Sequence, residues 1–125
     1  MSTEILNELK EEYKDKWIFH YQNLLHQQAL FIMEKSGHAM IRICKMDYED
    51  CVYLSDLYVN EDYRKNNLGN ELMVICEKIA RKIKVNAIEL DAYINSWVIE
   101  WYKKLGFEIT QSTGFITMVK KINIK

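Results

Sequence analysis

The sequence predicts a single α/β (α+β) domain in which helices flank a mixed, mostly antiparallel β-sheet. The chain has 125 residues, which is enough for one domain and too few for two. Its composition is 49% hydrophobic, so it can bury a sizeable core. Short apolar runs separated by turn signals fill the first half, whereas apolar runs alternate with helical periodicity in the second half.

One helix and a set of antiparallel strands are predicted in the first half. Residues 3–16 have the apolar spacing of an amphipathic helix, with Glu4 in the first turn. Residues 17–25 are mixed and are predicted to be a short strand that runs into a loop. Three strands of an antiparallel meander follow, separated by turn signals, at 29–34, 38–46 and 51–59.

A long helix begins the second half. Apolar residues recur at helical spacing over residues 68–84, and charged residues occupy the opposite face. The strand predicted at 85–92 follows this helix. A right-handed crossover of this kind makes it parallel to the strand at 51–59, so the sheet is mixed.

A second, shorter helix follows the parallel strand. Asn95 and Ser96 are suitable N-caps for it, and Gly106 fits the position just past its C-terminus. Trp97 and Trp101 are assigned to the core or to an interface. The last two strands are predicted at 107–110 and 115–121.

The charge balance argues against two classes of partner. The formal net charge is -1, from 17 basic and 18 acidic residues. Broad binding to nucleic acid or to an anionic membrane needs a strong basic excess, so neither is expected as a partner. No apolar run approaches the ~20 residues of a membrane span. Residues 1–16 are charged and lack the apolar core of a signal peptide, so none is expected.

Cysteine and histidine usage predicts a reducing compartment and no metal site. The cysteines are odd in number and sit in apolar stretches, which favours reduced core thiols and a cytoplasmic location. The histidines do not share a metal-ligand spacing. The residues concerned are Cys44, Cys51, Cys76, His20, His26 and His38.

The turn between the strand at 51–59 and the long helix has the features of an anion-binding site. The first amides of a helix have no intrahelical partner, and the helix dipole adds positive potential there. Arg64 and Lys65 contribute two full charges in the same turn. The sequence therefore predicts a phosphate cradle; the alternative is an ordinary connection whose cations are solvated.

Two stretches together resemble one known family. The first is Leu57-Tyr58-Val59 followed by Arg64-Lys65-Asn66-Asn67-Leu68-Gly69; the second is Asn95 and then Tyr102-Lys103-Lys104-Leu105-Gly106-Phe107. The pair resembles the GNAT superfamily of N-acetyltransferases, with its acetyl-CoA motif Arg/Gln-x-x-Gly-x-Gly/Ala and its later Tyr-x-x-Leu-Gly-Phe signature. The resemblance covers roughly residues 29–121. It implies a GNAT-like fold and direct transfer of acetyl from acetyl-CoA to a primary amine of a small molecule or protein.

The chain departs from the family pattern in two places. Asn67 stands where the motif has its first Gly; Asn is the non-Gly residue that best tolerates positive φ, so the turn can still form. The region ahead of residue 29 is shortened, with room for one helix and a short strand in place of the family's usual strand and two helices. That region helps to shape the acceptor side.

The resemblance implies which residues hold acetyl-CoA. The strand backbone before the turn would pair with the pantetheine arm as an added strand does. The amides of the turn and the first helical residues would hold the pyrophosphate. Asn95 would hydrogen-bond the pantetheine or only cap its helix. The cofactor-binding residues so implied are Leu57, Tyr58, Val59, Arg64, Lys65, Asn66, Asn67, Leu68, Gly69, Asn70 and Asn95.

The resemblance also assigns two catalytic residues. Tyr102 would protonate the departing thiolate, because a phenol with a pKa near 10 keeps its proton at neutral pH; the alternative is a core aromatic. Asp56 is the candidate base for the amine, and strand alternation places it on one face with Leu54 and Tyr58. The alternatives are that Asp56 is a structural carboxylate or that Ser55 holds a water that removes the proton.

The sequence is also compatible with a second function. A GNAT-like domain that binds CoA, or only a protein partner, without catalysis is the alternative function. The acceptor amine is not identified by the sequence. An apolar edge at the C-terminal strands would suit a homodimer.

Overall fold

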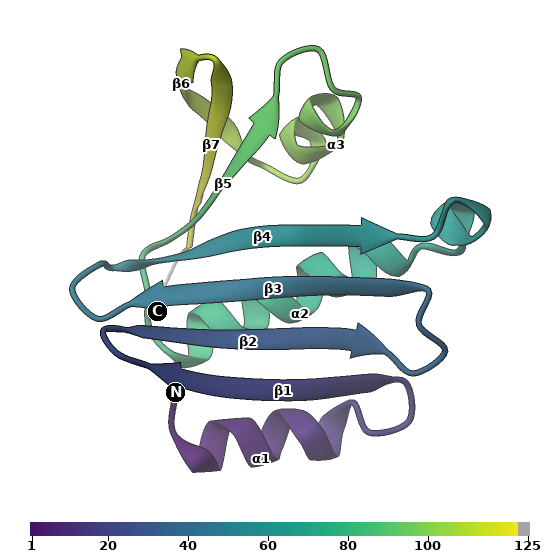
Figure 1. Ribbon diagram of the computed structural model, residues 1–125, viewed down its shortest axis with the longest axis vertical. Helices are drawn as coiled ribbons and strands as arrows, with labels where there is room; N and C mark the ends of the chain where they lie inside the picture. Colours follow the sequence, from purple (N-terminus) through teal and green to yellow (C-terminus); the bar gives the residue numbers. More distant parts are fainter. Residues whose placement is uncertain (123–125) are drawn as a thin grey trace.

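A seven-stranded sheet with helices packed against it forms the protein, in the computed structural model that describes residues 1–122 (Figure 1). The strand order is β1-β2-β3-β4-β5-β7-β6, and every neighbouring pair is antiparallel except β4 and β5. The predicted fold class is confirmed. The strands are β1 (Trp17–Leu24), β2 (Gln27–Glu34), β3 (Ala39–Met46), β4 (Cys51–Val59), β5 (Ala87–Tyr93), β6 (Glu108–Thr113) and β7 (Phe115–Lys121). The helices are α1 (Thr3–Glu12), the 3₁₀ helix η1 (Glu61–Asn66), α2 (Leu68–Lys82) and α3 (Val98–Lys104).

The predicted elements are all present, with shifts at their ends. The helix expected over residues 3–16 ends at Glu12, and the strand expected at 107–110 begins at Glu108 and continues to Thr113. The mixed segment after α1 is a full strand, because Trp17 to Leu24 pair residue by residue with β2. The meander therefore has four strands. In residues 1–122 we find no helix with the length and apolar character needed to cross a membrane.

One face of the sheet carries the hydrophobic core. Ile41 of β3 and Leu90 of β5 pack with α2, whose Leu72 and Ile79 are completely buried. Burying such side chains contributes about 1.5–3 kcal/mol each. Lys82 of α2 pairs with Glu8 of α1 at 2.8 Å on the surface, a contact of small energetic weight. Figure 1 shows the opposite face of β1–β4 toward the viewer, with none of the described helices across it.

The parallel pair β4 and β5 separates partway along its length. The two strands are paired only over residues 51–54 and 87–90. Beyond these residues β4 has β3 on one side and, within residues 1–122, no strand on the other. Backbone N–H and C=O groups on that side of β4 are therefore open to a ligand.

A β-bulge in β4 corrects one expectation from the sequence. Arg42 pairs with Ser55 and Met40 with Tyr58, so β4 has one more residue than β3 between these pairs. Asp56 takes the left-handed conformation, at φ 55°. The extra residue reverses the alternation, so that Leu57 packs toward the core while Asp56 and Tyr58 are exposed. The placement of Asp56 on the same face as Leu54 was therefore wrong.

The sheet ends at β6, whose residues are all exposed. Ile109 is the one apolar side chain of this strand, at 43% exposure. The apolar edge expected at the C-terminal strands is confined, on β6, to this residue.

Candidate active site

A groove of about 610 Å³ lies where the open side of β4 meets η1, the start of α2 and the start of α3. It is the place where the free backbone edge of β4 meets the N-terminus of a helix. The residues that line it are Leu57, Tyr58, Val59, Arg64, Asn67, Gly69, Asn70, Trp97, Val98 and Trp101. The first seven of these are among the predicted cofactor-binding residues.

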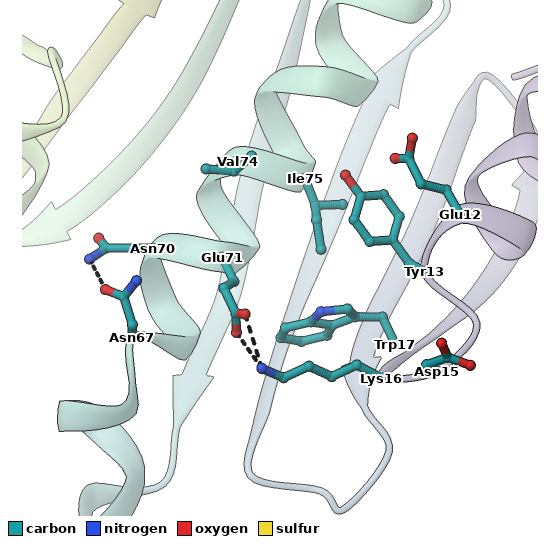
Figure 2. A pocket seen from close by; sticks show the side chains of 10 residues that line it. All are labelled: Glu12, Tyr13, Asp15, Lys16, Trp17, Asn67, Asn70, Glu71, Val74 and Ile75. Atoms are coloured by element: carbon teal, nitrogen blue, oxygen red, sulfur yellow. Dashed lines mark hydrogen bonds and ion pairs between the residues drawn. The ribbon is translucent and has the colours of Figure 1, made fainter.

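Asn67 joins η1 to α2 and leaves the first amides of α2 without a side-chain cap. It adopts the left-handed conformation at φ 65°, so the expectation that Asn tolerates a positive φ in this turn is confirmed. Its side-chain oxygen accepts a hydrogen bond from the Asn70 amide instead of capping the helix (Figure 2). The N–H groups of the first turn, together with the helix dipole, therefore form a site suited to an anion.

The charged groups around this helix start are arranged to favour an anion. Arg64 Nε donates to the Val59 carbonyl at 3.3 Å, and its guanidinium lies 5.6 Å from the centroid of the Trp97 ring. The acidic Glu71 in the first turn of α2 is paired with Lys16 at 2.7 Å (Figure 2). Lys16 thus offsets the one carboxylate that would oppose an anion in that turn.

Four predicted cofactor-binding residues do not line the groove. Lys65 and Asn66 belong to η1, and Leu68 is a core residue at 4% exposure, so only its backbone can serve the anion site. Asn95 is exposed, with φ 66°, and it is not the N-cap of α3. That cap position is Trp97, so the expectation that Asn95 caps the helix was wrong.

A second cavity, of about 520 Å³, continues the groove through the gap between β4 and β5. Leu57 and Val98 line both cavities, so the two adjoin. The lining includes core-facing residues such as Leu90 and residues of the opposite face such as Asp91. The second cavity is therefore lined by residues from both faces of the sheet.

Tyr102 lies in this second cavity. The side chain is 6% exposed, and its ring packs against Trp101 at 4.9 Å and Phe107 at 5.4 Å between centroids. Burial, with a smaller contribution from Cys76, raises the pKa of Tyr102 to about 12. The phenol is therefore protonated at neutral pH and can act as a proton donor.

Asp56 and Ser55 lie in the same cavity on the bulge of β4. The Asp56 carboxylate is exposed at the cavity wall. The Ser55 hydroxyl is buried, and no hydrogen-bond partner for it exists among residues 1–122. A buried hydroxyl without a partner costs free energy, so Ser55 is suited to hold a water or a polar group of a ligand.

Trp97, Val98 and Trp101 line the groove, although the two tryptophans were expected in the core or at an interface. Trp97 is 63% exposed. Residues 97, 98 and 101 share one helical face, and this spacing is found both in a buried core and in the wall of a groove. The sequence pattern therefore could not distinguish these two locations. Gly69 lies against this wall, because a Cβ there would be 3.2 Å from Trp101 Cζ2.

A third cavity, of about 360 Å³, lies on the α1 side of the same helix start. Figure 2 shows Trp17 and Tyr13 facing α2 across it, with Asn67 and Asn70 at its border. No group of His, Cys, Asp or Glu side chains in the described part of the chain is arranged to hold a metal ion.

Comparisons with known proteins place this geometry in a family. The family model described as Acetyltransferase (GNAT) family matches residues 2–107. An uncharacterized N-acetyltransferase of Methanocaldococcus jannaschii is 26% identical over 86% of this chain and 51% of its own length. The chain thus spans about half the length of this curated relative.

Solved structures share the fold at low sequence identity. The PaiA N-acetyltransferase of Thermoplasma acidophilum, in complex with coenzyme A, matches with a TM-score of 0.64 and 22% identity, over 94% of this chain and 69% of that one. The ribosomal-protein-S18-alanine N-acetyltransferase of Escherichia coli matches with a TM-score of 0.65 and 18% identity, over 100% and 92% of the two chains. With the family model matched over most of its length, the chain belongs to the GNAT acetyltransferase family.

Proposed function

We propose that the protein transfers an acetyl group from acetyl-CoA directly to a primary amine of a small molecule or protein. The observation that carries this proposal is the pair of adjoining cavities where β4 and β5 separate, one at the N-terminus of α2 and the other lined by Tyr102. The coenzyme A bound to the Thermoplasma acidophilum protein of the same fold supports the choice of co-substrate.

The groove offers one feature for the pyrophosphate and another for the pantetheine arm of the coenzyme. The amides at the start of α2, with Arg64 beside them, would hold the pyrophosphate. The unpaired edge of β4 at Leu57 and Val59 would accept the pantetheine arm as an added strand. This arrangement directs the thioester into the gap between the strands, where Tyr102 lies.

The reaction needs two proton movements. The amine nitrogen attacks the thioester carbonyl carbon, the C–N bond forms and the C–S bond breaks. Tyr102 gives its proton to the departing thiolate, which suits a phenol whose pKa is raised to about 12. The amine loses a proton to Asp56 or to a water held at Ser55.

The removal of the amine proton is a substantial part of the barrier. A free alkylamine with a pKa near 10.4 is only about one part in 10³ neutral at pH 7. The Asp56 carboxylate, or a water held at Ser55, accepts this proton while the amine is held against the thioester. Holding the two reactants in this geometry supplies the other part of the rate enhancement.

The free cysteines support a reducing compartment such as the cytoplasm. Cys44 and Cys76 are buried and Cys51 is partly buried, and none forms a disulfide among the described residues. Reduced thiols of this kind are usual in cytosolic proteins.

Calorimetry with acetyl-CoA, followed by a thiol-release assay over a panel of amines, tests the proposal. We expect saturable binding of acetyl-CoA and release of free CoA thiol in the presence of an amine. Absence of coenzyme binding would contradict the proposal. Binding without amine-dependent thiol release would favour the non-catalytic alternative.

A further inference from the structure

The second cavity, where the acceptor would bind, has a local excess of negative charge. Asp56 of β4 and Asp91 of β5 line the 520 Å³ cavity from the two strands that separate there. Its lining contains no Lys, Arg or His among residues 1–122. The chain as a whole is nearly neutral, at a formal net charge of -1, so the bias belongs to this cavity and not to the surface in general.

The carboxylate of Asp91 is held in place by two hydroxyl groups. Tyr53 donates to its Oδ2 at 2.9 Å and Thr117 donates to its Oδ1 at 2.7 Å. Burial, and then the neighbouring Asp91, raise the pKa of Tyr53 to about 12, so this donor keeps its proton. Each carboxylate oxygen retains a free lone pair that can accept from a ligand.

Neither carboxylate has a cationic side chain within ion-pair distance among residues 1–122. The ion pairs formed among the described residues include neither Asp56 nor Asp91. Both side chains are exposed, so a solute can reach the two carboxylates.

Two aromatic rings stand beside Asp91 at the mouth of the cavity. Tyr93 follows Asp91 by two residues on the same face of β5, and it pairs in register with Phe115 of β7. The ring centroids are 5.5 Å apart, and the side chains are 73% and 52% exposed. Aromatic faces next to carboxylates attract an ammonium group and offer nothing to an anion.

The reacting amine itself cannot be the group that this arrangement serves. An ammonium held by Asp91 and the two ring faces is stabilised in its charged form, and a protonated amine is not a nucleophile. The proton of the reacting amine is left to Asp56 or to the water at Ser55. The site is therefore suited to a charged nitrogen that does not react.

We propose that the acceptor carries a second ammonium group besides the amine that is acetylated, so that its class is the di- and polyamines. The second ammonium binds Asp91 between Tyr93 and Phe115, while the neutral amine reaches the thioester beside Tyr102. This inference rests on the acetyl-transfer function proposed above.

Three acceptors of equal chain length test the inference. We use 1,6-diaminohexane, 1-aminohexane and 6-aminohexanoate, which differ in the charge at the far end. We expect kcat/KM to be about tenfold higher for the diamine than for the monoamine at low salt, and lowest for the carboxylate. The advantage of the diamine should shrink as KCl rises from 0.05 to 0.5 M, because exposed charges are screened.

Variants locate the effect. Asp91→Asn should lower kcat/KM for the diamine about tenfold and leave 1-aminohexane within twofold; Tyr93→Ala should act in the same direction by about threefold. Glu108→Gln on β6, outside the cavity, serves as the matched control for loss of one carboxylate. Calorimetry with acetyl-CoA checks that each variant keeps its fold and its coenzyme affinity.

The outcomes separate the two proposals. If acetyl-CoA binds and amines are acetylated, but the diamine has no advantage over the monoamine, the acceptor inference is overturned and the acetyltransferase function stands. If acetyl-CoA does not bind, both are overturned. The comparison of the three acceptors on the unmodified protein needs no variant, so it decides the matter even where Asp91→Asn does not fold.

Discussion

Trp101 Nε1 donates a hydrogen bond of 3.2 Å to the side-chain oxygen of Asn70, which ties α3 to the first turn of α2. Asn70 in turn donates to Asn67, the left-handed residue that precedes the helix. The indole is thereby fixed across the groove, directly above Gly69. The hydrogen-bonded side chains of Trp101, Asn70 and Asn67 therefore determine the width of the groove at the anion site.

Gly69→Ala should weaken acetyl-CoA binding without destabilising the fold. The added Cβ would lie 3.2 Å from Trp101 Cζ2, so the indole must move in a groove where Asn70 holds it. We expect a threefold to tenfold loss of affinity by calorimetry, of order 1 kcal/mol. Alanine in a helix gains about 0.5–1 kcal/mol over glycine, so the melting temperature should not fall.

A double variant tests the cause of this loss. In the Trp101→Phe background the smaller ring leaves room for the Cβ, so Gly69→Ala should have little further effect on affinity. Equal losses in both backgrounds would show that the indole is not responsible.

Arg64→Ala should weaken coenzyme binding about tenfold. The guanidinium lies at the groove and can pair with a phosphate, a contact worth about 1.5–3 kcal/mol. Lys65→Ala is the matched control, because it removes one positive charge from the same 3₁₀ helix without touching the groove lining. Calorimetry at two salt concentrations measures both; equal effects of the two variants would count against a direct contact by Arg64.

Tyr102→Phe should lower kcat about a hundredfold and leave the affinity for acetyl-CoA unchanged. Loss of a general acid typically costs 10²–10⁴-fold, and the ring that packs against Phe107 remains. Tyr48→Phe, at an exposed tyrosine outside the described cavities, is the control. Steady-state thiol release separates kcat from KM, and unchanged turnover in Tyr102→Phe would remove the residue from its role.

Stability should fall as the pH rises from about 10 to about 12. The pKa of Tyr102 is raised to about 12 in the folded protein against an ordinary 10, so in this window the folded state holds a proton that the unfolded state has lost. The stability that this group contributes is complete below pH 10 and is lost as pH passes 12. Denaturant unfolding of Tyr102→Phe should therefore depend less steeply on pH, by up to ~1.4 kcal/mol per pH unit. An identical slope in the variant would contradict the assignment.

Asp56→Val should destabilise the protein by about 1–2 kcal/mol, whereas Asp56→Gly should not. The residue has φ 55°, a conformation that a β-branched side chain adopts only at a cost and that glycine adopts freely. Asp56→Asn keeps the conformational preference and removes the charge, so its kcat/KM reports on the base alone. Chemical denaturation measures the first pair; a Val variant as stable as the Gly variant would show that the bulge relaxes.

The parts of the fold that follow from local pattern could be predicted from the sequence. The 3.6-residue period of α2 and the apolar runs of β2 to β4 need no long-range information. The predicted turn at Asn67 depends on a property of one residue type, its tolerance of positive φ. These predictions hold because each rests on neighbours within a few positions.

The bulge and the groove wall could not be predicted in this way. No feature of the sequence near Asp56 identifies it as the extra residue of a bulge. The bulge arises from the register of β4 against Met40 and Arg42 of β3, which is a long-range pairing. The exposure of Trp97 depends on how far α3 stands from η1, which is a tertiary relationship. Alternation and helical periodicity assign faces only after the neighbouring elements are placed.

The short pairing of β4 with β5 has a mechanical consequence. Only four residues of each strand join the two parts of the sheet by backbone pairing, although α2 packs against strands of both parts. A pantetheine arm bound along the free edge of β4 would add contacts between the two parts of the sheet. Binding of the co-substrate should then slow amide hydrogen exchange on both sides of the gap between the strands, from Leu57 to Val59 and from Asp91 to Tyr93. Such slowing would show that the co-substrate stabilises the protein.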